Sequence, residues 1–236
     1  MLRRASLVLA LTVPLGTRSL PAQVTVVDEG SFTVSRNGVR IGREEFSIRT
    51  TPNAAAGATF VAQATAVYDN RRLFPALTAR PSGTPVTYQV EVRHGADVEQ
   101  KWSGAVGAGR VSARIVTARR DAVREFLAAD GALLLDDDVF HQYFFLARRR
   151  GAVPLPVIVP RRNVQEYLRF AERGQETIDI TGHAIASAMF AVTGPDSVER
   201  HVWVDTEGRV LKVAVPSQGL VAVRDEPPPT TGAAAR

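Results

Sequence analysis

The sequence lacks cysteine altogether, which excludes disulfide bridges, thiolate-bound zinc, iron–sulfur clusters and cysteine nucleophiles. Lysine is almost absent as well, because Lys101 and Lys212 are the only two among 29 basic residues. Beyond residue 22 no apolar run approaches the ~20 residues that a membrane-spanning helix needs. Hydrophobic residues at 45% and charged residues at 22% are ordinary for a globular chain, so a wholly disordered protein, a collagen or a coiled coil is excluded.

The formal net charge of +5 is compatible with nucleic-acid binding, but its distribution argues against it. The arginine pairs and triplets are spread along the chain, and acidic residues follow several of them, as Asp121 and Glu125 follow Arg119 and Arg120. A nucleic-acid binder needs one concentrated basic face that also carries aromatic side chains. We therefore expect the arginines to solvate the surface, and we predict no nucleic-acid partner.

Residues 1–22 have the pattern of a secretory signal peptide. A short basic start, Met1–Arg4, precedes an apolar run over residues 5–15 and a polar stretch in which Ala22 offers a small residue for cleavage. The alternative, a buried N-terminal helix, is disfavoured by Pro14. The sequence thus predicts an exported protein, periplasmic or secreted, whose mature chain begins near residue 23 and carries no further membrane-spanning segment.

The mature chain has the pattern of a succession of antiparallel strands. Asn37-Gly38 lies between two alternating runs, which is a strong signal for a two-residue hairpin. Beyond it the apolar residues change from odd to even positions, which predicts a β-bulge near Gly42-Arg43. The clearest strand is 86–93, where apolar and polar residues alternate as expected for a strand with one buried face and one solvent-exposed face. Further strands are expected at 59–68, 98–106, 110–118, 122–128, 164–171, 176–181, 184–193, 198–205, 209–215 and 219–224.

One segment has helical rather than strand character. Asp136-Asp137-Asp138 precede it and three arginines follow it, which matches the helix dipole, and the acids are interpreted as an N-cap with a negative first turn. Apolar residues over 139–147 cover most of the helix circumference, so this helix cannot lie half in water.

The predicted fold is therefore mostly β: a strongly curved antiparallel sheet, or unclosed β-barrel, with one helix packed on the concave side. It is expected to form a single domain over residues 23–225. The chain after it, residues 226–236, contains three consecutive prolines and small polar residues and is predicted to be a disordered tail.

The order of these features resembles that of uncharacterised periplasmic proteins grouped near the Lol-type lipoprotein carriers. The resemblance spans residues 24–225 and rests on the strand pair around Asn37-Gly38, the central Asp138…Tyr143…Arg148 helix and the ending His201-Val202-Trp203-Val204-Asp205…Gly208-Arg209. It implies an open barrel whose apolar concave side is covered by helices, and a non-enzymatic role as an apolar-ligand binder or cell-envelope factor. The family supplies no catalytic residues, and this chain has one such helix where the Lol carriers use more.

Aromatic residues of the helix and of two strands form the candidate ligand pocket. If the helix closes the mouth of the curved sheet, a lipid or acyl chain would share their surface. The pocket is assigned to Phe140, Tyr143, Phe144, Tyr88 and Trp102, and core packing without a ligand is the alternative. Arginines that flank the helix and its following loop are candidates for contact with an anionic head group or a membrane surface: Arg148, Arg149, Arg150, Arg161 and Arg162.

Two other functions stay open from the sequence. An exposed strand edge could make the protein a structural or protein-docking module of the envelope, with an envelope protein as its partner. The Asp136–Asp138 run with His141 could instead serve a metal-dependent hydrolase, because Asp138 and His141 would be i and i+3 on a helix and could face one ion. No second histidine or glutamate lies at ligand spacing nearby, so we assign no metal, cofactor or catalytic residue.

Overall fold

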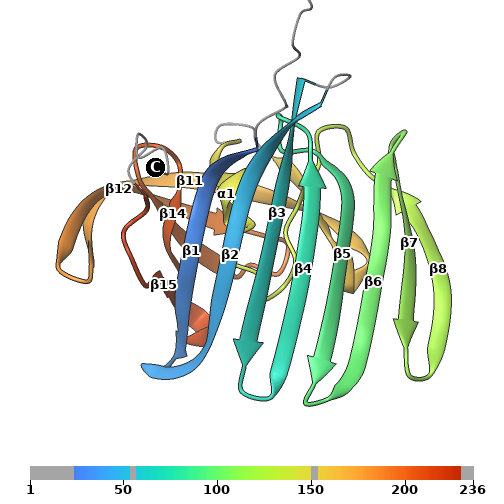
Figure 1. The fold of residues 1–236 in the computed structure, drawn as a ribbon. Helices are drawn as coiled ribbons and strands as arrows, with labels where there is room; N and C mark the ends of the chain where they lie inside the picture. The colour runs from blue at the N-terminus through green and yellow to red at the C-terminus, as the bar shows by residue number, and fades with distance from the viewer. Residues whose placement is uncertain (1–23, 54–56, 150–153, 230–236) are drawn as a thin grey trace, which may run out of the picture.

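The chain folds into one continuous open sheet (Figure 1). In the computed structural model, which describes residues 24–53, 57–149 and 154–229, the sheet has 15 strands in the spatial order β8-β7-β6-β5-β4-β3-β2-β1-β15-β14-β13-β12-β11-β10-β9. Neighbouring strands are antiparallel except β9 and β10, which are parallel. The first eight strands along the chain are β1 (Thr25–Arg36), β2 (Val39–Asn53), β3 (Gly57–Tyr68), β4 (Arg71–Ala79), β5 (Pro85–His94), β6 (Asp97–Gly107), β7 (Arg110–Thr117) and β8 (Arg120–Leu127). The remaining elements are β9 (Leu133–Leu134), α1 (Tyr143–Ala147), β10 (Leu155–Val159), the 3-10 turn η1 (Pro160–Arg162), β11 (Val164–Ile180), β12 (His183–Thr193), β13 (Glu199–Val204), β14 (Val210–Val215), the 3-10 turn η2 (Pro216–Gln218) and β15 (Leu220–Arg224).

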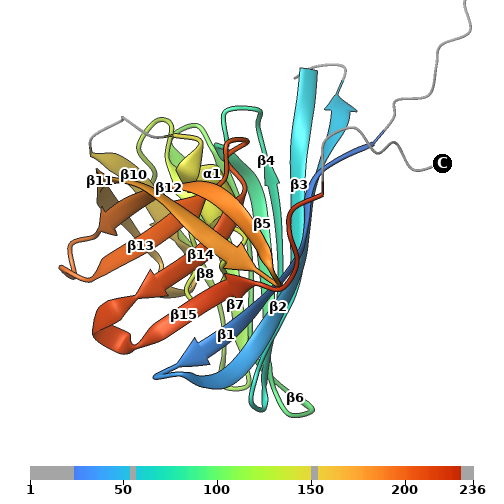
Figure 2. The same ribbon diagram turned by 90° about the vertical axis from the view of Figure 1, so that its left-hand side faces the viewer.

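The sheet bends so that its two arms enclose an interior. Strands β1 to β8 form one arm as an antiparallel meander, β10 to β15 form the other, and the arms meet where β1 pairs with β15. Figure 2 shows the second arm turned toward the concave face of the first, with α1 between them. The predicted fold class, a mostly β, strongly curved and unclosed antiparallel sheet with one helix on its concave side, is confirmed.

A buried ion pair fastens the two arms at their junction. Arg224 of β15 donates to both carboxylate oxygens of Asp28 on β1, at 2.8 and 3.1 Å, and both side chains are 1% exposed. Arg224 also donates to the backbone carbonyl of Glu29. A Cβ atom at Gly30 would lie only 2.9 Å from the Arg224 guanidinium, so the glycine leaves the space through which this side chain crosses β1.

The predicted hairpin at Asn37-Gly38 is confirmed. Both residues have positive φ, 51° and 78°, as a two-residue turn of this kind requires. The predicted bulge is present one residue earlier than expected: Val34 pairs with Gly42 and Ser35 with Arg40, which leaves Ile41 without an opposite residue. The extra residue produces the change of apolar register from odd to even positions that the sequence shows.

Apolar side chains from both arms and from the segment that links them form one core. Along β5 the inward residues Tyr88, Val90 and Val92 are at most 1% exposed and alternate with more exposed ones. Residues 128–149, hereafter the covering segment, fill the concave side with further buried side chains, Phe140 and Phe144 among them. The candidate pocket residues therefore belong to the same core as the sheet.

The predicted helix is present but much shorter than its sequence pattern suggests. It covers only Tyr143–Ala147, its N-cap is Gln142, and its first turn holds no acidic residue. The interpretation of Asp136-Asp137-Asp138 as an N-cap with a negative first turn is therefore wrong. Two physical reasons explain this: Asp138 adopts a positive φ of 59°, which stops a helix, and Asp136 turns inward to form an ion pair.

Several strands differ from their predicted limits. β4 and β10 were not expected. Pro75 and Pro156 interrupt their apolar patterns, and proline is usually confined to edge strands, strand starts and bulges. The two runs predicted at 164–171 and 176–181 form the single strand β11, which continues through an irregularity between Glu172 and Gly174.

Some sequence predictions concern residues outside the part of the chain that the structure describes. The signal peptide over residues 1–22 is one of them, as is residue Arg150. Of the predicted tail, residues 226–229 are described and contact the sheet, since Arg209 donates to the backbone carbonyl of Pro229. None of the helices within residues 24–53, 57–149 and 154–229 has the length and apolar character to cross a bilayer.

Candidate functional site

A buried carboxylate holds the covering segment against the sheet. Glu44, at an inward position of β2, is fully buried and bonds two consecutive residues of the segment. One oxygen accepts the backbone N–H of Phe140 at 2.6 Å, and the other accepts the backbone N–H of His141 at 3.0 Å and lies 2.5 Å from its Nδ1. The His141 ring is also stacked on Phe46, with ring centroids 5.9 Å apart. This part of the cover is thus fixed to β2 by directional contacts.

A second buried carboxylate, Asp136, ties the covering segment to β5 and η1. It accepts hydrogen bonds from the hydroxyl of Tyr88 at 2.8 Å and from Nε of Arg161 at 2.9 Å. Arg161 also donates to the backbone carbonyl of Asp137. Burial raises the pKa of Asp136, whereas Arg161 and the Tyr88 hydroxyl act to lower it. Burial together with the neighbouring Asp136 carboxylate raises the pKa of Tyr88 well above its ordinary value.

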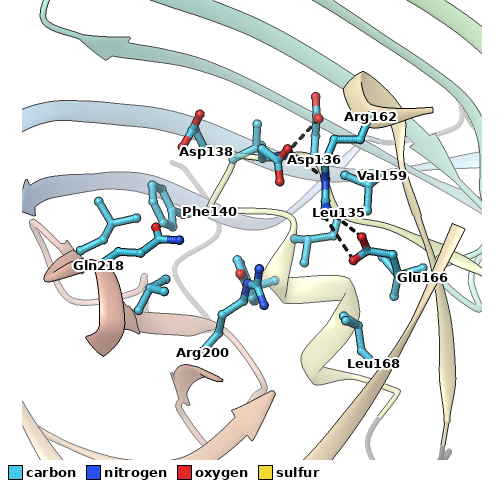
Figure 3. Close-up of a pocket in the computed structure, with 16 residues that line it drawn as sticks. Leu135, Asp136, Asp138, Phe140, Val159, Arg162, Glu166, Leu168, Arg200 and Gln218 are labelled. Carbon is cyan, nitrogen blue, oxygen red and sulfur yellow. Dashed lines mark hydrogen bonds and ion pairs between the residues drawn. The ribbon is translucent and has the colours of Figure 1, made fainter. Parts of the chain in front are cut away.

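A partly enclosed cavity of about 210 Å³ lies beside this network (Figure 3). Its walls come from the covering segment and from the second arm of the sheet. The apolar lining consists of Leu135, Val139, Phe140, Tyr143, Val157, Val159, Leu168, Val215 and Leu220. The polar lining consists of Asp136, Asp137, Asp138, Arg162, Glu166, Arg200 and Gln218. In Figure 3, Asp138 and Gln218 lie on one side of the cavity and Arg162 and Glu166 on the other.

Each charged residue that lines the cavity takes part in at least one ion pair. The contacts are Asp136 with Arg161 (2.9 Å), Asp137 with Arg162 (3.3 Å), Glu166 with Arg162 (2.6 Å), Arg200 with Asp196 (2.8 Å) and Asp138 with Arg71 (3.7 Å). Asp137 and Glu166 share Arg162, so the five carboxylates of these pairs exceed the four guanidinium groups by one.

Tyr143 differs from the other tyrosines of the interior. The hydroxyls of Tyr68 and Tyr88 donate at 2.8 Å to the carbonyl of Asp138 and to the carboxylate of Asp136, respectively. Tyr143 lines the cavity and is 7% exposed, and its hydroxyl makes no hydrogen bond to any residue that the structure describes. Burial raises the pKa of Tyr143 to about 12, so the phenol is neutral at physiological pH.

The structure brings together part of the predicted ligand pocket. Phe140 and Tyr143 line the cavity. Phe144 lies in the core instead, with its ring edge-on to those of Phe60 and Phe145. Tyr88 and Trp102 pack against each other on the inner face of the sheet with ring centroids 5.7 Å apart, and the Trp102 indole N–H donates to Asn163.

The arginines predicted to meet a head group make contacts within the protein. Arg148 lies over the Phe144 ring at 4.7 Å, and Arg149 donates to the carbonyl of Ser82. Arg161 is buried against Asp136, and Arg162 pairs with Glu166 and Asp137 at the cavity. Only Arg162 of these four described side chains therefore lies at the cavity itself.

Asp138 and His141 lie in different surroundings. Both precede α1, so they do not share a helix face. The Asp138 side chain is 41% exposed and pairs with Arg71, whereas His141 is 1% exposed and pairs with Glu44. Among residues 24–53, 57–149 and 154–229, no group of three or more histidine, aspartate or glutamate side chains is arranged to hold a metal ion.

Sequence reasoning missed two residues that organise the site, Glu44 and Arg200. Strand parity could have found both. Glu44 shares the even, inward-facing register of Phe46 and Ile48, and Arg200 shares that of Val202. A charged residue at an inward position of a strand must find a buried partner, so it marks a polar site on the concave side.

Comparisons with known proteins bear on the fold alone. No family model matches the sequence, and no curated protein matches it either. Among solved structures the chain is similar to a beta-barrel-like protein of the domain of unknown function DUF1849 from Brucella abortus. The TM-score is 0.56 at 8% sequence identity, and the match covers 86% of this chain and 97% of the other.

Proposed function

We propose that the protein is an exported, non-enzymatic binder of an apolar ligand, such as an acyl chain, that acts in the cell envelope. The observation that carries the proposal is the partly enclosed cavity between the covering segment and the second arm, because nine of its sixteen lining residues are aliphatic or aromatic. The basic, apolar and small-residue pattern of residues 1–22 supports export to the periplasm or beyond. The resemblance to the Lol-type carriers supports the same kind of role, since those proteins cover the concave side of an open barrel.

The size of the cavity limits what it can hold. At ~30 Å³ for each water-sized group, a volume of about 210 Å³ accommodates roughly seven non-hydrogen atoms. This is below the range of roughly 300–1,000 Å³ that drug-sized ligands occupy. We therefore expect a short chain, or the end of a longer one, and not a complete lipid with two acyl chains.

The proposal is tested by filling the cavity. Leu135→Trp places an indole at a half-buried position of the lining, and Leu127→Trp is the matched control because Leu127 is 71% exposed on the edge strand β8. Protein secreted into the periplasm of a Gram-negative host is analysed by native mass spectrometry and by organic extraction. We expect an apolar adduct on the wild type and on the control, and its loss from Leu135→Trp. An adduct-free wild type, or an adduct that survives in Leu135→Trp, contradicts the proposal.

A second function is favoured by one observation on the first arm. Strand β8 ends the sheet and pairs only with β7, and its side chains Val123 and Leu127 are 65% and 71% exposed. Such an edge can accept a strand from a partner, which is the geometry of a structural or docking module of the envelope. Val123→Lys places a charge on the edge strand and should prevent a partner strand from pairing with β8. We expect the variant to lose its envelope partner in a pull-down. If the variant still retains the partner, docking does not occur at this edge.

A further inference from the structure

The cavity is lined by a tyrosine whose hydroxyl has no hydrogen-bond partner in the part of the chain that the structure describes. Tyr143 is the first residue of α1 and its side chain is 7% exposed. Its hydroxyl meets no acceptor among the described residues. Arg200, which also lines the cavity, donates to Asp196 and to the carbonyl of Val198. Among the described residues, the fully buried side-chain atoms without a hydrogen bond are Nε2 of His141 and Nε2 of Gln142. The Tyr143 hydroxyl is not one of them and can donate to a group that enters the cavity. A ligand with one suitably placed acceptor would satisfy it.

The charges around the cavity argue against an ionic ligand. Every charged lining residue already pairs with a residue of opposite sign, as Arg200 does with Asp196 and Glu166 does with Arg162. An anionic head would meet more carboxylates than guanidinium groups at the lining. A cationic head would have to lose part of its hydration in this enclosed space to reach carboxylates that arginines already neutralise in part. An uncharged head meets neither obstacle.

We propose that the cavity selects an uncharged amphipathic molecule, with a short chain against the apolar wall and one oxygen acceptor that receives the Tyr143 hydroxyl. This inference rests on the proposed function and specifies its ligand class: a neutral alcohol, ester or amide of about seven non-hydrogen atoms, or the corresponding end of a longer chain. Leu135, Val159 and Leu168 form the chain-binding wall. The phenol is the donor throughout the physiological pH range, because burial raises its pKa to about 12.

The test compares three probes of equal chain length: hexan-1-ol, hexanoate and hexylammonium. Each is titrated at pH 7.5 into the ¹⁵N-labelled full-length mature protein, and dissociation constants are obtained from amide chemical shifts. We expect hexan-1-ol to bind at least about 10-fold more tightly than either ion, with shifts confined to the cavity lining. Tyr143→Phe should weaken hexan-1-ol about 3- to 10-fold, the range expected for one neutral hydrogen bond. Tyr167→Phe is the control, since Tyr167 is 49% exposed on β11 and should leave the affinity unchanged.

The outcomes separate this inference from the function on which it rests. Equal or tighter binding of an ion, or an unchanged affinity in Tyr143→Phe, overturns the neutral-ligand inference while leaving the apolar-ligand function in place. Absence of any saturable shift with hexan-1-ol also overturns the inference. The proposed function falls with it only if the native-mass experiment on the wild type and Leu135→Trp detects no apolar adduct. Thermal unfolding of Tyr143→Phe shows that the variant is folded, and we expect no loss of stability because no bond within the protein is removed.

Discussion

Replacing Glu44 by glutamine is expected to loosen the covering segment and to lower the stability of the whole protein. The backbone N–H groups of Phe140 and His141 both point at the Glu44 carboxylate, at 2.6 and 3.0 Å on different oxygens. Glutamine keeps one acceptor oxygen and replaces the other by an N–H donor. At least one buried backbone N–H and the new amide group therefore lose their partners. At about 1–3 kcal/mol for each unsatisfied buried group, Glu44→Gln should cost about 2–6 kcal/mol.

The neighbouring residue provides a matched control for this prediction. Glu45 faces solvent, with a side chain that is 65% exposed and pairs with Arg43 at 3.1 Å, so Glu45→Gln should change the stability by less than about 0.5 kcal/mol. Urea unfolding is followed by tryptophan fluorescence, since Trp102 and Trp203 are both buried, at 1% and 5% exposure. For a denaturant slope of about 2–3 kcal/mol/M, the midpoint of Glu44→Gln should fall by about 1–3 M. Equal midpoints for the two variants would refute the assignment of Glu44 as the anchor of the cover.

Three other perturbations test the fold. Gly42→Ala should destabilise the first arm, because the new Cβ atom would lie 2.3 Å from the backbone carbonyl oxygen of Val67. An unchanged midpoint in thermal unfolding would contradict this close approach. Arg224→Met should lower the free energy of unfolding in urea by about 3–5 kcal/mol, because it leaves the Asp28 carboxylate buried without its partner. The double variant with Asp28→Leu should recover most of that stability. No recovery would contradict the pairing. Three of the 4 tyrosines should stay protonated at pH 10 in the folded protein, because their folded-state pKa values are raised: Tyr68, Tyr88 and Tyr143. Their contribution to stability is complete below pH 10 and is lost as the pH rises through those folded values. A phenolate titration of the folded protein that is complete near pH 10 would refute this prediction.

The sheet could be predicted from the sequence because its signals are local. The hairpin depends on two residues that tolerate positive φ, and the inward and outward faces of β5 depend on simple alternation. The bulge at Ile41 was visible as a change of apolar parity within a few residues. None of these features needs knowledge of what lies across the interior.

The covering segment could not be predicted in the same way, because its conformation depends on distant partners. Asp136 is separated from Tyr88 by 48 residues and from Arg161 by 25, and these two contacts turn its carboxylate inward instead of toward a helix terminus. Helix dipole and amphipathic pattern both favoured a longer helix, and the buried ion pair with Arg161 outweighed them. The inward parity of Glu44 indicates that a partner is required, but only the bend of the sheet shows that the partner is the covering segment.

The same ion pairs explain why a cavity remains in a core that is otherwise filled. Apolar residues that face each other in a bowed sheet pack together to remove empty space. Around the cavity this is opposed by a rim of charged residues whose side chains stay partly hydrated, including Asp137 at 46% exposure and Arg162 at 39%. Bringing the second arm closer to the covering segment would bury these charges, and the cost of removing them from water opposes the gain from additional apolar contacts. The charged rim thus keeps the apolar wall accessible, which is the condition that the proposed neutral ligand requires.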